Sequence, residues 1–293
     1  MLATALALML ALALAPAWVG AAPAPVRGND VGNDVPAGLR CLQSAYPETV
    51  CGVTAMALVL CNGKRLAWDD GRGAKPYTQF LEQADLEDMM LQRYRPGIDL
   101  EALAPPPENF EPGRIRHEAF FRAMYGETAA EVSAHLVEVP WLPKSGGGVL
   151  SVTRKNGVAA ALRAVSDELE QTMPPSVLKV LAKTAGGFFW RKVKGSVRRS
   201  NHSFAIAVDV GMGRSDYWDW RRPDAQGRYA YRNRFPIEAV PAFERHGFVW
   251  GGKWYHYDTM HFEYRPELLV APCVEGPSPL VSIVPGRAGV PRP

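Results

Sequence analysis

The sequence has few cysteines, little net charge and no long hydrophobic run. Only four cysteines occur among 293 residues, and none are spaced as Cys-x-x-Cys, which argues against a cysteine-rich zinc site. The formal net charge of +3 neither requires a nucleic-acid partner nor excludes an anionic polymer. With 47% hydrophobic residues, the chain is long enough for one large domain or two small ones with a sizeable core.

The longest apolar run lies at the start of the chain. Leu2–Ala15 is uncharged, rich in Ala and Leu, and shorter than the roughly 20 residues that span a membrane. Pro16 ends the run, and the small-residue pattern Val19-Gly20-Ala21 follows. We expect residues 1–21 to be a signal peptide, so that the protein is exported, periplasmic or secreted, with no transmembrane anchor after cleavage.

The four cysteines fit export, because an even number in an oxidising compartment usually forms disulfides. They are Cys41, Cys51, Cys61 and Cys273. If the chain from Cys51 to Cys61 is one extended strand, these two residues lie about 33 Å apart, at roughly 3.3 Å per residue. That pairing is therefore the one we expect least, and the other two remain open.

The organisation of the rest follows from composition. Pro-rich and Gly-Asn-Asp-Val repeats predict a linker over 22–40, and a Pro/Gly-rich composition predicts a loose tail over 276–293. Between them we expect one domain over 41–275. Its parts are an N-terminal extension (41–112) and a helical part with the catalytic core (113–275).

Local patterns predict a few elements. Val53–Leu60 and Arg65–Trp68 flank Asn62-Gly63, which predicts a hairpin. Thr78–Tyr94 has the pattern of an amphipathic helix. A second apolar helix face is formed by Val158, Leu162, Val165 and Leu169 and should end near Pro174-Pro175. Short strands and helices without a repeating strand-helix order indicate an α+β fold with a small, mostly antiparallel sheet.

Two short segments contain three of the six histidines, each next to carboxylates. In the first, Asp209 lies in a strand-like stretch, and His202 precedes it by an odd offset, so we expect His202 in a loop or bulge. In the second, Asp258 precedes His261 by three residues, and a turn would bring both to one centre. A lone histidine or turn aspartate is more often structural, but their combination favours a metal site.

The chemistry of these residues is that of a zinc hydrolase. His202, Asp209 and His261 offer three ligands for one zinc ion and leave a position for water, whose pKa falls to roughly 7. Asp258 would take the proton from that water and deliver it to a leaving amine. His256 is the rival third ligand or lines the substrate cleft, and Glu263 could orient a zinc-bound histidine.

The same residues carry a resemblance to a known family. Ser200-x-His202, Asp209 and, about fifty residues later, Asp258-x-x-His261 resemble the motifs of the VanY-type zinc peptidases, related in fold to lysostaphin and the hedgehog domain. These D-alanyl-D-alanine carboxypeptidases and L-alanyl-D-glutamate endopeptidases cut peptidoglycan stem peptides. The resemblance implies the same ligands, Asp258 as base, and substrate contacts from Ser200 and an upstream arginine. Arg191 is the first candidate for that arginine, with Arg198 and Arg199 as alternatives. The family's glycine is Ala205 here, which a strand should tolerate.

The basic, aromatic segment Trp190–Arg199 admits three interpretations. It could bind single-stranded nucleic acid, but an exported protein encounters little nucleic acid. It could form a rim that suits the free carboxylates of stem peptides, or simply a solvated basic face. The sequence thus predicts an exported zinc peptidase acting on peptidoglycan, with no nucleic-acid partner. The alternative is a zinc-stabilised wall-binding module without turnover.

Overall fold

The strands that carry the predicted ligands belong to one antiparallel sheet. In the computed structural model, which describes residues 35–99 and 102–274, this sheet has the order β6-β7-β9-β8. The strands are β6 (Thr184–Gly186), β7 (Ala207–Val210), β8 (Phe248–Trp250) and β9 (His261–Tyr264). The central strands β7 and β9 pair directly, with Val208 opposite Phe262 and both fully buried.

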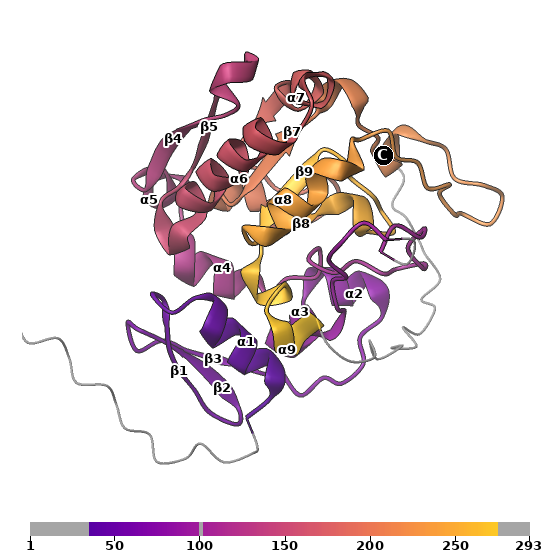
Figure 1. The fold of residues 1–293 in the computed structure, drawn as a ribbon. Coiled ribbons are helices and arrows are strands. Elements are labelled where there is room, and N and C mark those ends of the chain that lie inside the picture. Colours follow the sequence, from indigo (N-terminus) through magenta and orange to yellow (C-terminus); the bar gives the residue numbers. More distant parts are fainter. Residues whose placement is uncertain (1–34, 100–101, 275–293) are drawn as a thin grey trace, which may run out of the picture. The chain divides into compact units, whose positions relative to one another are not determined.

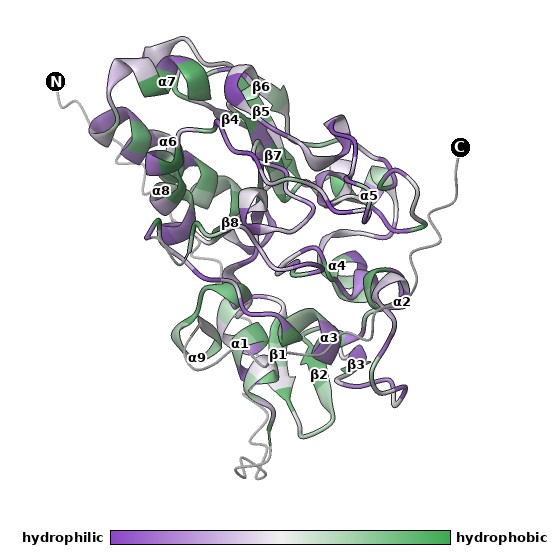
Figure 2. Cartoon of the chain, turned by 90° about the vertical axis from the view of Figure 1, so that its right-hand side faces the viewer, coloured by the Kyte–Doolittle hydropathy of each residue, from purple (hydrophilic) through white to green (hydrophobic). Residues whose placement is uncertain are grey.

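Helix α6 (Val158–Thr172) forms part of the core beside this sheet. Its residues Val158, Leu162, Val165 and Leu169 are all fully buried, as the sequence pattern predicted. The helix ends at Thr172, and its C-cap Met173 directly precedes Pro174, as expected from the missing N–H of proline. Figure 1 shows α6 beside α8 (Val240–Arg245), with which it is in contact. In Figure 2 hydrophobic and hydrophilic stretches alternate along α6, as in an amphipathic helix.

The other described strands form two smaller antiparallel sheets. One contains β1 (Val50–Val53), β2 (Ala57–Leu60) and β3 (Arg65–Ala67), and the other β4 (Leu136–Pro140) and β5 (Val149–Thr153). The β2–β3 pair confirms the predicted hairpin around Asn62-Gly63, but its first strand begins at Ala57, and Val53 belongs to β1. The other helices are α1 (Ala37–Ala45), α2 (Tyr77–Glu82), α3 (Leu86–Leu91), α4 (Glu118–Tyr125), α5 (Ala129–Ser133), α7 (Pro175–Leu181) and α9 (Ala271–Val274). The expected α+β class is confirmed.

Two further predicted boundaries were wrong. The single helix expected over Thr78–Tyr94 is split into α2 and α3, because Asp85 caps a new helix through a capping box with Asp88. The linker expected over 22–40 is helical from Ala37, where α1 begins, and Leu39 is fully buried in the main core. The apolar side chains of α1 therefore outweigh the linker-like composition before them.

The disulfide expected least is present. Cys51 is bonded to Cys61 with a Cα–Cα distance of 4.8 Å, and Cys41 to Cys273 at 6.5 Å. The prediction failed because the segment is not one strand: the chain reverses between β1 and β2, which makes Val50 the partner of Leu60. The second disulfide joins α1 to α9, which lie side by side (Figure 1).

The predicted signal peptide and the predicted tail over 276–293 lie outside the described residues. Within the described ranges, every helix is too short or too polar to cross a membrane.

Candidate metal centre and substrate pocket

Three side chains from the two predicted segments meet at one point. His202, Asp209 and His261 each offer one ligand atom, and these atoms all lie within 4.8 Å of one another. The two imidazole rings are 5.1 Å apart between centroids. The structure therefore brings together the three residues that the sequence singled out as ligands.

The orientation of His202 is fixed by its backbone and by a contact of its Nδ1 nitrogen. It lies in a 3-10 turn over Asn201–Phe204, outside β7 as expected, and the Ser200 hydroxyl accepts a hydrogen bond from its N–H. Its Nδ1 lies 2.6 Å from the carbonyl oxygen of Gly187, so Nδ1 is the nitrogen that carries the proton. Its Nε2 faces Asp209 Oδ2 at 3.3 Å and, among the described residues, has no hydrogen-bond partner although it is buried.

His261 lies directly opposite Asp209 across the β7–β9 pair. Its Nδ1 is 3.1 Å from Asp209 Oδ1, and its Nε2 is 3.2 Å from Glu263 Oε2. Burial disfavours the charged imidazole, but these two carboxylates outweigh it and raise the pKa of His261 to about 10. Despite its own burial, Asp209 has a pKa well below its usual range because of the two histidines.

This donor set fits a zinc ion. Two imidazole nitrogens and one carboxylate oxygen converge, and the other nitrogen of each ring is held by an oxygen acceptor. The acceptor for His261 is Glu263, which is fully buried. Burial alone would raise its pKa, but His261, Arg116 and Arg265 lower it to about 2, so Glu263 is a carboxylate that accepts from Nε2–H.

Asp258 lies beside this centre at the start of a turn. The N–H of His261 donates to the Asp258 carbonyl at 3.2 Å, which is the turn that the Asp-x-x-His spacing predicted. Burial raises the pKa of the Asp258 carboxyl to about 6, and its Oδ1 is buried without a partner among the described residues. A proton acceptor of this strength is suited to work near neutral pH.

Ala205 differs from the expectation. It is not in a strand but ends the 3-10 turn that carries His202, with a left-handed φ of 56°. Glycine adopts this conformation without steric cost, whereas a Cβ is unfavourable there. The glycine of the family motif is explained by this turn, which alanine adopts here under strain.

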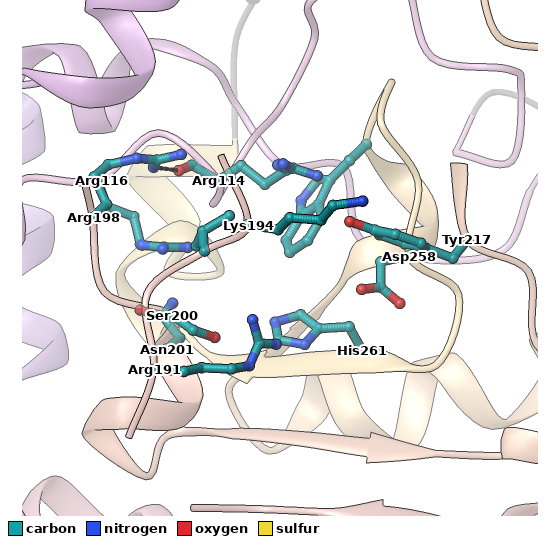
Figure 3. Close-up of a pocket in the computed structure, with 12 residues that line it drawn as sticks. Arg114, Arg116, Arg191, Lys194, Arg198, Ser200, Asn201, Tyr217, Asp258 and His261 are labelled. Carbon is teal, nitrogen blue, oxygen red and sulfur yellow. Dashed lines mark hydrogen bonds between the residues drawn. The ribbon is translucent and has the colours of Figure 1, made fainter. Parts of the chain in front are cut away.

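A basic pocket opens next to the metal centre (Figure 3). Its lining includes the predicted residues Asp258, His261, Ser200 and Arg191. Most of its other lining residues are basic or aromatic: Arg114, Arg116, Lys194, Arg198, Tyr217 and Trp254, with Val193 and Asn201. The segment Trp190–Arg199 thus contributes part of this lining, while Arg199 stacks on Trp190 with its Cζ 4.4 Å from the ring centroid.

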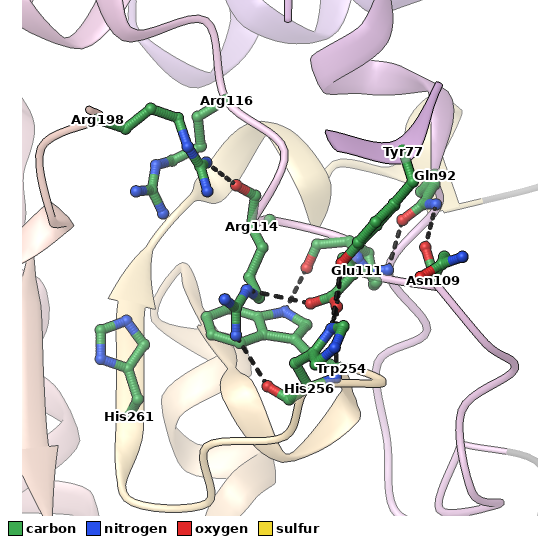
Figure 4. Close-up of polar contacts among 12 residues, drawn as sticks. Tyr77, Gln92, Asn109, Glu111, Arg114, Arg116, Arg198, Trp254, His256 and His261 are labelled. Atoms are coloured by element: carbon green, nitrogen blue, oxygen red, sulfur yellow. Dashed lines mark hydrogen bonds and ion pairs between the residues drawn. The ribbon is translucent and has the colours of Figure 1, made fainter. Parts of the chain in front are cut away.

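His256 does not join the three ligands. Its Nδ1 pairs with the buried carboxylate of Glu111 and lies 3.1 Å from the hydroxyl oxygen of Tyr77. Its backbone carbonyl accepts a hydrogen bond from Arg114 at 2.9 Å (Figure 4). Its Nδ1 is thus engaged away from the three ligands, and within the described ranges neither the ligand cluster nor the lining of the basic pocket includes His256.

Sequence reasoning missed several residues of the site. Arg114 and Arg116 come from a segment far upstream, in which no local pattern marks them as functional. Asn201 occupies the variable position of the Ser-x-His motif, and its Nδ2 donates to Glu263 at 2.5 Å. Its place between Ser200 and His202 was the one available signal.

The fold and the site together define a candidate metallopeptidase centre, and comparison with known proteins agrees. Residues 194–264 match the model of a family described as D-alanyl-D-alanine carboxypeptidase. The match spans both motifs and confirms the resemblance to this peptidase family. A search of curated proteins and a search of solved structures gave no significant match.

Proposed function

We propose that the protein is an exported zinc metallopeptidase that hydrolyses a peptide bond in peptidoglycan stem peptides. The observation that carries the proposal is the convergence of His202, Asp209 and His261 beside Asp258 in a basic pocket. The family match over residues 194–264 supports the peptidase class. The leader-like composition of residues 1–21 supports export.

The residues would divide the chemistry between them. His202, Asp209 and His261 would hold one zinc ion, which supplies Lewis-acid activation of water and of the substrate carbonyl. Asp258 accepts the proton of the water whose oxygen attacks the carbonyl carbon. It then passes that proton to the amide nitrogen as the carbon–nitrogen bond breaks, which yields a carboxylic acid and an amine.

The pocket walls suit an anionic peptide. Stem peptides carry free carboxylates, which basic side chains can bind. The pocket lining contains five lysine and arginine side chains and one acid, Asp258. Arg191 and Ser200 line the pocket next to the metal centre, which supports their proposed contact with substrate. We propose no nucleic-acid ligand for this pocket, because an exported protein encounters little nucleic acid.

The alternative, a zinc-stabilised wall-binding module, is less well supported. A structural zinc site is usually closed by a fourth protein ligand. The cluster of His202, Asp209 and His261 offers three, and Asp258, the one acid of the pocket lining, has the raised pKa of a proton acceptor.

Replacement of Asp258 tests the proposal. Asp258→Asn keeps the shape of the side chain, so we expect bound zinc to remain at one ion per chain while muropeptide release falls by about 10²- to 10⁴-fold. Asp167→Asn, an exposed position on α6, is the matched control and should retain full activity. Unchanged turnover in Asp258→Asn would exclude Asp258 as the base, and a zinc-free wild-type protein would exclude the metallopeptidase.

A further inference from the structure

Charged side chains follow His261 at every second position of the sequence. They are Glu263, Arg265 and Glu267, which alternate in sign and are all fully buried. Glu263 holds Nε2 of His261 and lies near the end of the segment that the family model matches, whereas Arg265 and Glu267 lie beyond that segment. Buried charges are costly unless each is paired, so the partners of these side chains indicate what the buried group does.

Arg265 connects the two glutamates. Its Nη1 forms an ion pair with Glu263 Oε1 at 3.2 Å, and its Nε pairs with Glu267. Nη1 also donates to the carbonyl of Gly113 at 2.6 Å. Gly113 has a positive φ of 103°, and a Cβ there would lie 3.2 Å from Glu263 Oε1. Three acceptors therefore hold the guanidinium group, which in turn fixes the oxygen of Glu263 that does not contact His261.

Tyr46 contacts this group of charges from the N-terminal part of the chain. It is the C-cap of α1, is fully buried, and its hydroxyl donates to Glu267 Oε2 at 2.6 Å. Burial and the neighbouring carboxylate raise the pKa of Tyr46 well above its usual range, so the hydroxyl keeps its proton and donates. The ring packs edge-on against Phe120 of α4, with 5.7 Å between centroids. The position of the hydroxyl is therefore fixed by α1 and α4.

Helix α1 is itself attached to the segment that carries Glu267. It contacts the 3-10 turn Pro266–Leu268, and the disulfide Cys41–Cys273 joins it to α9. Its residue Leu39 is fully buried in the main core. Tyr46 thus meets Glu267 from a rigid support, as a group that positions another side chain requires.

We propose that Tyr46, Glu267 and Arg265 form a positioning network for the metal centre. Tyr46 orients Glu267, which in turn orients Arg265. Arg265 then holds Glu263 where it accepts the hydrogen bond from Nε2–H of His261, and such outer partners fix the orientation of a metal-binding histidine. The inference rests on the zinc centre of the proposed function. It adds helix α1, outside residues 194–264, to the parts that this centre requires.

Two buried tyrosines with the same local chemistry provide the test. Like Tyr46, Tyr94 is buried and donates to a glutamate at 2.6 Å, but its partner Glu244 pairs with Lys253. Tyr46→Phe and Tyr94→Phe each remove one donor from a buried carboxylate, so both should lose stability in thermal unfolding. Only Tyr46→Phe should weaken zinc binding, by about 3- to 10-fold, which is less than the 10- to 100-fold typical of a direct partner. Zinc dissociation constants are measured on the full chain by competition with a chelator.

A double-variant cycle shows whether Tyr46 acts through Glu263. In the Glu263→Gln background, the effect of Tyr46→Phe on zinc affinity should shrink toward no change, because the group that transmits it has been altered. Equal zinc affinities of Tyr46→Phe and Tyr94→Phe would overturn the inference, and so would fully additive effects in the double variant.

Muropeptide release separates this inference from the proposed function. If zinc affinity responds as stated but wild type releases no muropeptide, the proposed function fails and the positioning network stands. If wild type releases muropeptide and Asp258→Asn does not, while Tyr46→Phe binds zinc as tightly as wild type, the network fails and the proposed function stands. A wild-type protein that binds no zinc would overturn both.

Discussion

Glu263 accepts a hydrogen bond from Nε2 of His261, two residues earlier on the same strand, at 3.2 Å. Successive side chains of a strand alternate between its faces, so the i, i+2 spacing places both on one side. Because Glu263 is ionised, Nε2 must carry the proton, which leaves Nδ1 as the ligand nitrogen beside Asp209. A carboxylate of this kind fixes the tautomer and orientation of a metal-binding histidine.

We therefore expect Glu263→Gln to weaken zinc binding by about 10- to 100-fold, as replacements of such partners typically do. The dissociation constant is measured by competition with a chelator of known affinity. Glu138→Gln, at an exposed position of β4, is the matched control and should leave zinc affinity unchanged. Equal affinities for both variants would show that Glu263 serves packing alone.

The two disulfides should differ in their contribution to stability. Cys51–Cys61 closes a separation of 10 residues and Cys41–Cys273 one of 232. In the chain-entropy account, the short loop contributes about 3 kcal/mol and the long loop about 5 kcal/mol. Denaturant unfolding of the paired Cys→Ala variants should thus show the larger loss for Cys41–Cys273. A larger loss for Cys51–Cys61 would mean that native contacts, not loop length, dominate.

The three side chains that converge were predictable because side-chain chemistry and spacing are local. Asp258 and His261 share one turn, and Ser200, His202 and Asp209 share one turn and strand. The motifs therefore contain most of the geometry of the metal centre. What they do not contain is the pairing of β7 with β9, which makes Asp209 and His261 partners across 52 residues.

The remaining features depend on contacts between distant segments, which local patterns do not specify. Arg114 reaches the pocket because Arg198, Arg265 and Trp254 hold its backbone, and no spacing in the sequence records these bonds. The Cys51–Cys61 disulfide was misjudged for a related reason: a chain reversal between two short strands was not recognised.

The strained turn at Ala205 gives a stability prediction with an internal reference. Ala205 and Ala207 are both fully buried, but only Ala205 has a positive φ, of 56°. Replacement by glycine removes one buried methyl group in each case, and at Ala205 it also relieves the left-handed strain of about 1–2 kcal/mol. Ala205→Gly should therefore have a free energy of unfolding about 1–2 kcal/mol higher than Ala207→Gly. Equal values would show that the turn carries no strain.

The proposed role of Asp258 as the base predicts that its pKa sets the acid limit of activity. Burial raises it to about 6, and a general base must be deprotonated to accept a proton. We expect kcat/KM to be constant above this pKa and to fall about tenfold per pH unit below it, because each unit reduces the carboxylate fraction tenfold. Bound zinc is measured at each pH, so that loss of metal is not mistaken for protonation of the base.

Arg114 offers the check on this assignment. Its positive charge lowers the pKa of Asp258 against the effect of burial. Removal of that charge in Arg114→Gln should therefore move the acid limb to higher pH, whereas Arg245→Gln, whose side chain pairs with Glu168 on the surface, should leave it in place. An acid limb that stays at the same pH in Arg114→Gln would mean that a group other than Asp258 limits the reaction in acid.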